Sequence, residues 1–168
     1  MVGFTQAYGE AVPLLFLPQG YAQTNYDITP NFSAKQNYAH VTKLAVSIDQ
    51  VEQTSREMRR AFHAMKHGRP GPALVEMPRD VMAQAVSETE AQYTSTQVMR
   101  SAPSVGDVQD SVRALLAAKC PVIWAGQGVL YAEACEQLKV FAELTQIPVI
   151  TTMQAKSAFP DDHPLALG

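Results

Sequence analysis

The chain has 168 residues, of which 46% are hydrophobic, 17% are charged and 8% are aromatic, and its formal net charge at pH 7 is -3. No basic patch indicates a nucleic-acid partner, and no apolar run approaches the roughly 20 residues that a membrane helix needs. The N-terminus has no secretory signal and the two cysteines are too few for a disulfide framework, so we expect a cytoplasmic protein.

The first fifty residues begin with the last turns of a predicted helix, residues 1–9. Residues 12–17 form a nearly continuous apolar run, which predicts a strand buried on both faces of a parallel sheet and ended by Pro18. Residues 21–37 form a long irregular segment, and segments of this length are often functional or cover a neighbouring part of the molecule.

A helix is predicted to begin near residue 51, with Asp49 as its N-cap and Glu52 completing a capping box. Its inner face would carry Met58 and Phe62, and basic residues would cover the outer face. Gly68 is expected to stop the helix in a left-handed conformation. The turn GRPGP then leads into a short strand, residues 73–77, which Pro78 ends.

The second half of the chain follows a polar segment, residues 80–103, that is typical of a linker between domains. Ser104 and Asp107 predict a capping box at the start of a helix. The inner face of that helix would be an apolar stripe, namely Val108, Val112, Leu115 and Leu116. Residues 121–125, 130–146 and 147–151 then predict a strand, a helix and a strand. This order predicts a βαβ unit with a right-handed parallel crossover.

A glycine-rich turn, Gly126 to Gly128, directly follows the predicted strand at residues 121–125. Such a turn can bring backbone N–H groups close to a phosphate at the start of a helix. The full dinucleotide fingerprint has a third glycine, and Tyr131 occupies its position here. A plain structural turn and a nucleotide contact therefore both remain open.

The two histidines of the helix near residues 51–67, His63 and His67, share one face, but the glutamate of the zinc signature is absent, so solvated histidines are expected. Asp161, Asp162 and His163 are adjacent and are expected to form a surface turn rather than a metal site.

Two further residue types could carry chemistry. Cys120 and Cys135 are expected to be small buried or half-buried hydrophobic residues. Glu76 could be a buried acid, although an outward orientation or an arginine partner is favoured. The residues by themselves do not define a complete active site.

Five segments together carry a family resemblance, and their order and spacing agree over nearly the whole chain. The sequence resembles thiamine diphosphate-dependent enzymes of the acetolactate synthase (acetohydroxyacid synthase) large-subunit type. The segments are FTQAYGEAVPLLFLPQG, VTKLA, AFHAMKHGRPGPALVEMPRDV, CPVIWAGQGV and LTQIPVITTMQAKSAFPDDHPLALG.

The resemblance implies that residues 1–80 are the C-terminal half of a pyrimidine-binding domain and residues 104–168 the N-terminal half of a central domain, with residues 81–103 as a linker. The expected fold class is thus α/β, with two incomplete three-layer parallel-sheet (Rossmann-like) half-domains. Intact members act on 2-oxo acids with thiamine diphosphate and Mg2+, as homodimers or homotetramers. Neither Glu10 nor Glu76 falls in the motif of the family's catalytic glutamate, and the GDG…N motif for magnesium is absent. We therefore expect a fragment that is inactive alone, with no catalytic or metal-binding residues assigned.

In the branch of the family that holds FAD, the matching cofactor contacts are Gly126, Gly128, Thr152 and Gln154. Ala155 replaces the usual glycine, and the arginine that precedes TK in FAD binders is absent, which argues against FAD. The alternative function is a non-catalytic nucleotide (FAD)-binding or interaction module derived from the family.

Overall fold

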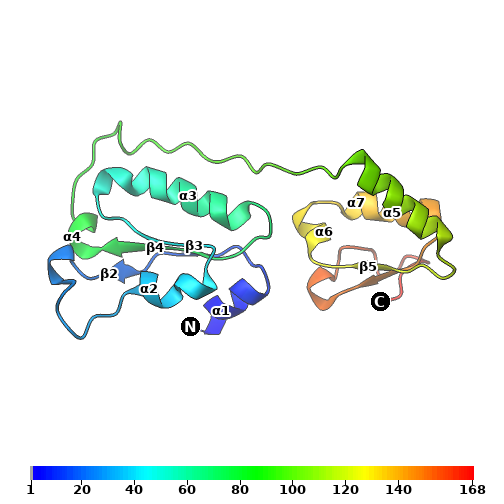
Figure 1. Ribbon diagram of the computed structural model, residues 1–168, viewed down its shortest axis with the longest axis horizontal. Helices are drawn as coiled ribbons and strands as arrows, with labels where there is room; N and C mark the ends of the chain where they lie inside the picture. The colour runs from blue at the N-terminus through cyan, green and yellow to red at the C-terminus, as the bar shows by residue number, and fades with distance from the viewer. Residues whose placement is uncertain (1) are drawn as a thin grey trace. The chain divides into compact units, whose positions relative to one another are not determined.

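The computed structural model describes residues 2–168, which form two compact units divided between Ser101 and Ala102. Figure 1 shows that each unit has its own strands and helices. Each unit is described separately below.

The sheet of the first unit is built around β4 (Ala73–Pro78), the strand predicted at residues 73–77. β3 (Leu44–Ser47) pairs with β4, as do the short strands β1 (Leu15–Phe16) and β2 (Gln19–Gly20), and every pairing is parallel. All of β4 except Met77 is buried, as expected for a central strand of a parallel sheet that is covered on both faces.

The strand predicted at residues 12–17 is shorter than expected, because β1 ends at Phe16. Pro18 does not end the pairing of this segment with β4. The Pro18 carbonyl accepts a hydrogen bond of 2.9 Å from the Met77 backbone N–H, and pairing resumes in β2. Pro18 has no N–H to donate, so the ladder is interrupted there rather than finished.

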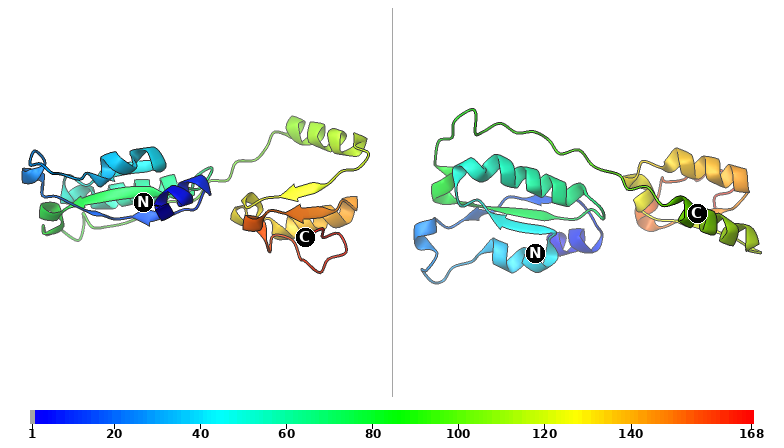
Figure 2. Two further views of the ribbon diagram at one scale, coloured as in Figure 1. Left: turned by 90° about the horizontal axis from the view of Figure 1, so that it is seen from below. Right: turned by 45° about the horizontal axis from the view of Figure 1, so that its top comes forward.

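Helices cover both faces of this sheet, as Figures 1 and 2 show. α3 (Thr54–Lys66) covers one face, where a core forms around Ala61, Met65, Ala73 and Val75. α1 (Val2–Gly9) and α2 (Ala34–Tyr38) cover the other face with a second core around Leu74. Alternate residues of β4 therefore face different helices, and the three-layer α/β prediction is confirmed.

The start of α3 differs from the predicted capping box at Asp49 and Glu52. A 3-10 turn, η3 (Val51–Gln53), precedes α3, and its N-cap is Gln50, which makes no side-chain capping bond. Gly68 has φ +62 just after α3, so the predicted left-handed stop is confirmed.

Shorter elements complete the first unit: η1 (Gln23–Asn25), η2 (Ala39–Val41) and α4 (Arg79–Met82). The irregular segment after α4 runs beside α3. The Ser55 hydroxyl donates to the Glu90 carbonyl at 3.2 Å, and the Arg59 Nε donates to the Thr94 carbonyl at 3.1 Å. Part of the segment expected to be a linker is therefore held against α3.

The second unit has two parallel strands, β5 (Ile123–Ala125) and β6 (Val149–Thr151), which agrees with the predicted βαβ order. Its core contains Ala125, Ala142, Val149 and Phe159. η4 (Met153–Ala155) follows β6.

The single helix predicted over residues 130–146 is wrong, because two helices occupy this stretch. They are α6 (Gly128–Tyr131) and α7 (Cys135–Thr145). The chain turns between them, where Glu133 adopts φ 55, a value that a continuing α-helix does not allow.

The helix predicted after Ser104 is confirmed as α5 (Val105–Ala117), and the Ser104 hydroxyl accepts a bond of 3.1 Å from the Asp107 N–H. Its apolar stripe is not buried within the described residues: Val108, Val112 and Leu116 are 45%, 43% and 80% exposed. The helix itself was predictable from its pattern, whereas the expected burial of its stripe is absent.

Candidate functional site

The predicted cofactor residues of the second unit come from two segments that lie next to each other. Gly126 and Gly128 follow β5, and Thr152 and Gln154 follow β6. Because β5 and β6 are parallel neighbours, both segments leave the same edge of the sheet. The Thr152 N–H donates a hydrogen bond of 3.0 Å to the Ala125 carbonyl, which fixes the two segments together.

The backbone of the glycine turn is open to approach. A Cβ added at Gly126 or at Gly128 would meet no atom within 4 Å, so a ligand could reach either Cα. The helix that follows, α6, has only four residues, so its dipole offers little attraction to a phosphate. The geometry thus leaves space for a ligand without supplying a strong anion site.

A second candidate site is a cavity of about 490 Å³ in the first unit. It lies beside the carboxyl ends of β3 and β4, which provide Ser47 and Glu76. Ligands of open parallel sheets commonly bind at this edge. The irregular segment and α2 supply the remaining wall, including Tyr21, Tyr26, Phe32 and Lys35.

Glu76 is a buried acid, so the favoured prediction of an outward or arginine-paired side chain is wrong. Its side chain is on the α2 face of β4 and the residue is 7% exposed. One carboxylate oxygen, Oε1, accepts a hydrogen bond of 2.8 Å from the backbone N–H of Ala34, the first residue of α2. The other, Oε2, lies 3.4 Å from both the Ser33 hydroxyl and the Lys35 N–H. A carboxylate at this position stabilises the unpaired N–H groups of the first helical turn.

Gly20 is the neighbour that makes room for this acid. A Cβ at Gly20 would lie 3.0 Å from the Glu76 Cγ and 3.4 Å from its Cδ. The absence of a side chain at residue 20 therefore lets β2 pass close to the carboxylate.

The phenol of Tyr26 reports on the electrostatics of the cavity. Its pKa is raised, mainly because burial disfavours the phenolate, and the carboxylates of Asp49, Glu76 and Asp80 act in the same direction. The Ser47 hydroxyl, which has no hydrogen-bond partner among the described residues, acts in the opposite direction. Three acidic side chains near the phenol thus add to the effect of burial. Two features of the sequence pointed toward this site, namely the unusual length of residues 21–37 and the possibility that Glu76 is a buried acid.

The two histidines at the end of α3 stack on each other; His63 is exposed, as predicted, and His67, the residue after the helix, is half-buried. The rings of His63 and His67 are 3.5 Å apart between centroids and inclined by 20°. The His67 Nδ1 lies 3.1 Å from the His63 carbonyl oxygen, and its Nε2 accepts a bond of 3.2 Å from the Met99 N–H. Backbone groups therefore engage both ring nitrogens of His67.

The three residues Asp161, Asp162 and His163 do not converge on one point. Asp161 pairs with Lys156 at 3.0 Å, and the His163 Nε2 lies 3.3 Å from the Glu143 carboxylate. Within residues 2–168, no group of three or more histidine, cysteine or acidic side chains could hold a metal ion.

The cysteines differ partly from expectation. Both are free; Cys135 is half-buried as expected, whereas Cys120 is exposed. In the described part of the chain, no helix is long and apolar enough to cross a membrane.

These features define a class of protein: α/β units with parallel strands whose candidate sites lie at the carboxyl edges of the sheets. Comparison with known families gives a more specific result. Residues 108–168 match the family described as "Thiamine pyrophosphate enzyme, central domain". Residues 108–168 thus belong to the central-domain family of thiamine pyrophosphate enzymes, and the resemblance that the motifs predicted is confirmed.

Individual relatives agree with this assignment. A glyoxylate carboligase of Escherichia coli O157:H7 is 40% identical over 76% of this chain and 22% of the relative. An acetolactate synthase of Mycobacterium bovis is 36% identical over 76% of this chain and 21% of the relative. A probable acetolactate synthase large subunit of Methanocaldococcus jannaschii is 31% identical over 100% of this chain and 30% of the relative. The chain therefore spans less than a third of the length of these relatives.

Proposed function

We propose that this chain is part of a thiamine diphosphate-dependent carboligase or decarboxylase that acts on small 2-oxo acids. The observation that carries the proposal is an alignment over 100% of the chain with a relative described as a probable acetolactate synthase large subunit. The name glyoxylate carboligase, borne by another relative, also refers to carbon–carbon bond formation on a 2-oxo acid.

Within this proposal the first unit belongs to the pyrimidine-binding domain, with residues 1–80 as its C-terminal half. Residues 81–103 connect it to the central domain, which begins at residue 104. The match of residues 108–168 to a central-domain family supports the last assignment. The whole enzyme would be a cytoplasmic homodimer or homotetramer, as in the family that the motifs resemble.

Residues 2–168 do not provide a side-chain site for the magnesium that would hold the cofactor's diphosphate. The described residues hold no cluster of metal-binding side chains, and the sequence has no GDG…N motif. Bound thiamine diphosphate supplies an electron sink to a reaction of this kind. Because the donors for its metal would have to come from outside these 168 residues, we propose that the chain alone is catalytically inactive.

A segment exchange tests the proposal. Residues 1–168 would replace the aligned segment of the Methanocaldococcus jannaschii relative, and acetolactate formation from pyruvate would be measured with thiamine diphosphate and Mg2+ present. We expect product from the chimera and none from the 168-residue chain alone. The unaltered relative, expressed in the same way, is the control.

Two results would contradict it. The first is a chimera that folds and assembles like the unaltered relative but forms no product. The second is turnover by the isolated chain, which would show that its own residues complete an active site.

The second candidate function is non-catalytic: the chain would be a module that binds FAD or another nucleotide. It is favoured by the joining of the Gly126 and Thr152 segments at one edge of the sheet. FAD fluorescence quenching by the chain would measure binding. Gly128→Leu should abolish it and Gly9→Leu, in the other unit, should not; equal affinity in both variants would argue against this function.

A further inference from the structure

The cavity of the first unit combines two kinds of side chain that together recognise a particular ligand chemistry. Three aromatic residues and three acidic residues line it: Tyr21, Tyr26, Phe32, Asp27, Asp49 and Glu76. Among the described residues that line it, Lys35 is the one with a cationic side chain. The side chains that line the cavity therefore carry a net negative charge.

The aromatic side chains are available to a ligand. Tyr21, Tyr26 and Phe32 are 48%, 45% and 53% exposed, far more than aromatic residues that belong to a core. Phe4, for comparison, is 8% exposed in the core between α1 and the sheet. Exposed ring faces attract cations through their quadrupole, and organic ammonium ions are the ligands for which this attraction is most used.

Two acidic side chains provide the complementary charge, one from a buried residue and one from an exposed residue. Glu76 is almost fully buried at the base of the cavity, and its Oε1 is engaged by the Ala34 N–H at 2.8 Å. Its Oε2 has only the longer contacts of 3.4 Å, so this oxygen keeps capacity to accept a shorter bond. Asp49, an exposed residue two positions after the end of β3, adds a second negative charge.

We propose that this cavity binds a small organic ammonium ion, with the aromatic side chains against its alkyl groups and Glu76 and Asp49 facing its charge. A volume of about 490 Å³ is within the range of small-molecule sites. An anion of the same size would face the carboxylates without an adequate counter-charge. The proposal rests on the lining side chains of the cavity and not on the proposed function.

The experiment uses two probes of nearly equal shape, choline and its neutral analogue 3,3-dimethyl-1-butanol. Each is titrated into the 168-residue chain, and backbone amide shifts are followed by NMR. We expect choline to bind with a Kd in the millimolar range and the neutral analogue to bind about tenfold more weakly, because only choline gains the charge-dependent contacts.

Variants locate the site. Glu76→Gln and Asp49→Asn remove a charge with little change of shape, and Tyr26→Leu removes a ring face; each should weaken choline binding about three- to tenfold. Glu52→Gln, an exposed acid outside the lining, is the matched control and should leave the affinity unchanged. If Glu76→Gln does not fold, Asp49→Asn and Tyr26→Leu decide the question.

Three results would overturn the proposal. They are no choline binding to the unaltered chain, equal affinity for choline and the neutral analogue, or unchanged choline affinity in both Asp49→Asn and Tyr26→Leu. None of these results bears on the carboligase proposal, because neither probe is a substrate or cofactor of that reaction.

Discussion

The side-chain ammonium of Lys43 donates a hydrogen bond of 2.6 Å to the carbonyl oxygen of His67, the residue that follows α3. It donates a second bond, of 2.8 Å, to the Arg69 carbonyl. The last carbonyls of a helix lack partners within the helix, and a lysine can satisfy them and favour the dipole. Lys43 thus joins the motif VTKLA to the motif GRPGP, which lie far apart in the sequence.

A side chain at Gly71 would crowd this arrangement. A Cβ at residue 71 would lie 3.0 Å from the Lys43 Cδ and 3.1 Å from its Cγ. We predict that Gly71→Ala displaces Lys43 and destabilises the first unit by about 1–2 kcal/mol. The displacement would weaken the hydrogen bonds from Lys43 to the His67 and Arg69 carbonyls. Urea unfolding followed by the amide NMR signals of β4 measures this unit alone.

A second background separates the mechanism from a general effect of alanine. With Lys43→Ala present, Gly71→Ala should be neutral or stabilising, because the crowding atoms are gone. Gly9→Ala, at a helical glycine with nothing within 4 Å, is the control and should not destabilise. The same cost in both backgrounds would refute the proposed contact.

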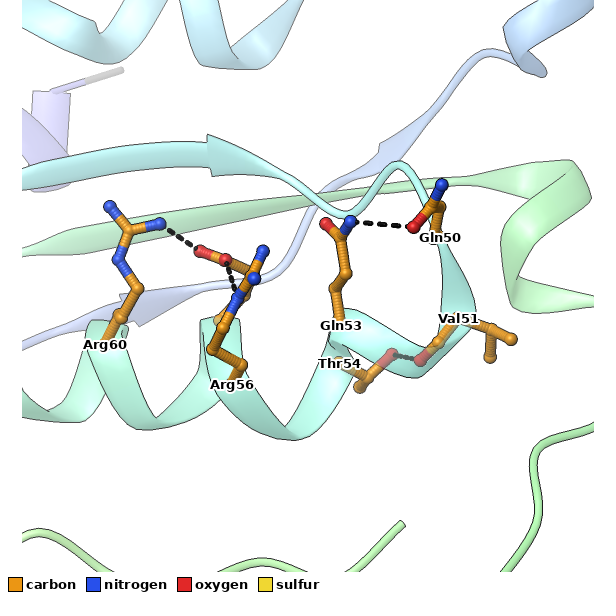
Figure 3. A network of polar contacts seen from close by, with 7 residues as sticks. Gln50, Val51, Gln53, Thr54, Arg56 and Arg60 are labelled. Atoms are coloured by element: carbon orange, nitrogen blue, oxygen red, sulfur yellow. Dashed lines mark hydrogen bonds and ion pairs between the residues drawn. The ribbon is translucent and has the colours of Figure 1, made fainter. Parts of the chain in front are cut away.

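Glu57 on α3 is a buried acid, 3% exposed, held between two arginines. The Arg56 Nε lies 3.0 Å from its Oε1 and the Arg60 Nη1 lies 2.7 Å from its Oε2, and Figure 3 shows both arginines beside the helix. We predict that Arg56→Ala or Arg60→Ala alone costs less than about 1 kcal/mol, because one partner remains. The double variant should cost clearly more than the sum, because it leaves a buried carboxylate without a counter-charge.

The matched control for this cycle is the exposed pair Arg113 and Asp110, which is 2.6 Å apart on α5. Arg113→Ala should change the unfolding free energy of the second unit by no more than about 0.5 kcal/mol. Strict additivity of the two α3 substitutions would show that the arginines act on Glu57 independently, and would contradict the prediction.

Short-range chemistry explains what was predictable from the sequence. The stop at Gly68 and the strand that follows were predictable because glycine and proline restrict the backbone at their own positions. The hydroxyl cap of Ser104 was predictable because its partner is three residues away. The family motifs predicted a central domain in the second half of the chain, and the match of residues 108–168 supports this prediction.

The candidate cavity was much less predictable, because its contacts join distant parts of the chain. The orientation of Glu76 depends on Ala34, which is 42 residues earlier, and on the missing side chain of Gly20. Hydrophobic periodicity does not depend on such contacts, so the commoner outward orientation or an arginine partner was favoured for Glu76. The domain assignments and the four FAD-related residues stay predictions.

Tyr26 offers a direct measurement of the field in that cavity. Burial and the carboxylates of Asp49, Glu76 and Asp80 raise its pKa above the ordinary value of 10.0, and the nearby Ser47 hydroxyl acts in the opposite direction. We predict that Tyr26 ionises above pH 10.0 in the folded chain. The ring-carbon NMR shifts of labelled tyrosine measure this, and Tyr26→Phe assigns the signal.

Substitution of one carboxylate tests the cause. Asp49→Asn should lower the pKa of Tyr26 while leaving it above 10.0, because burial is the largest cause and persists. Asp110→Asn, in the other unit, should leave the pKa of Tyr26 unchanged. Because the folded state keeps the phenol proton to higher pH than the unfolded state, this residue's contribution to stability is complete below pH 10.0. It is lost as the pH rises from 10.0 through the folded-state pKa. A Tyr26 that ionises at or below pH 10.0, or whose pKa rises in Asp49→Asn, would contradict this prediction.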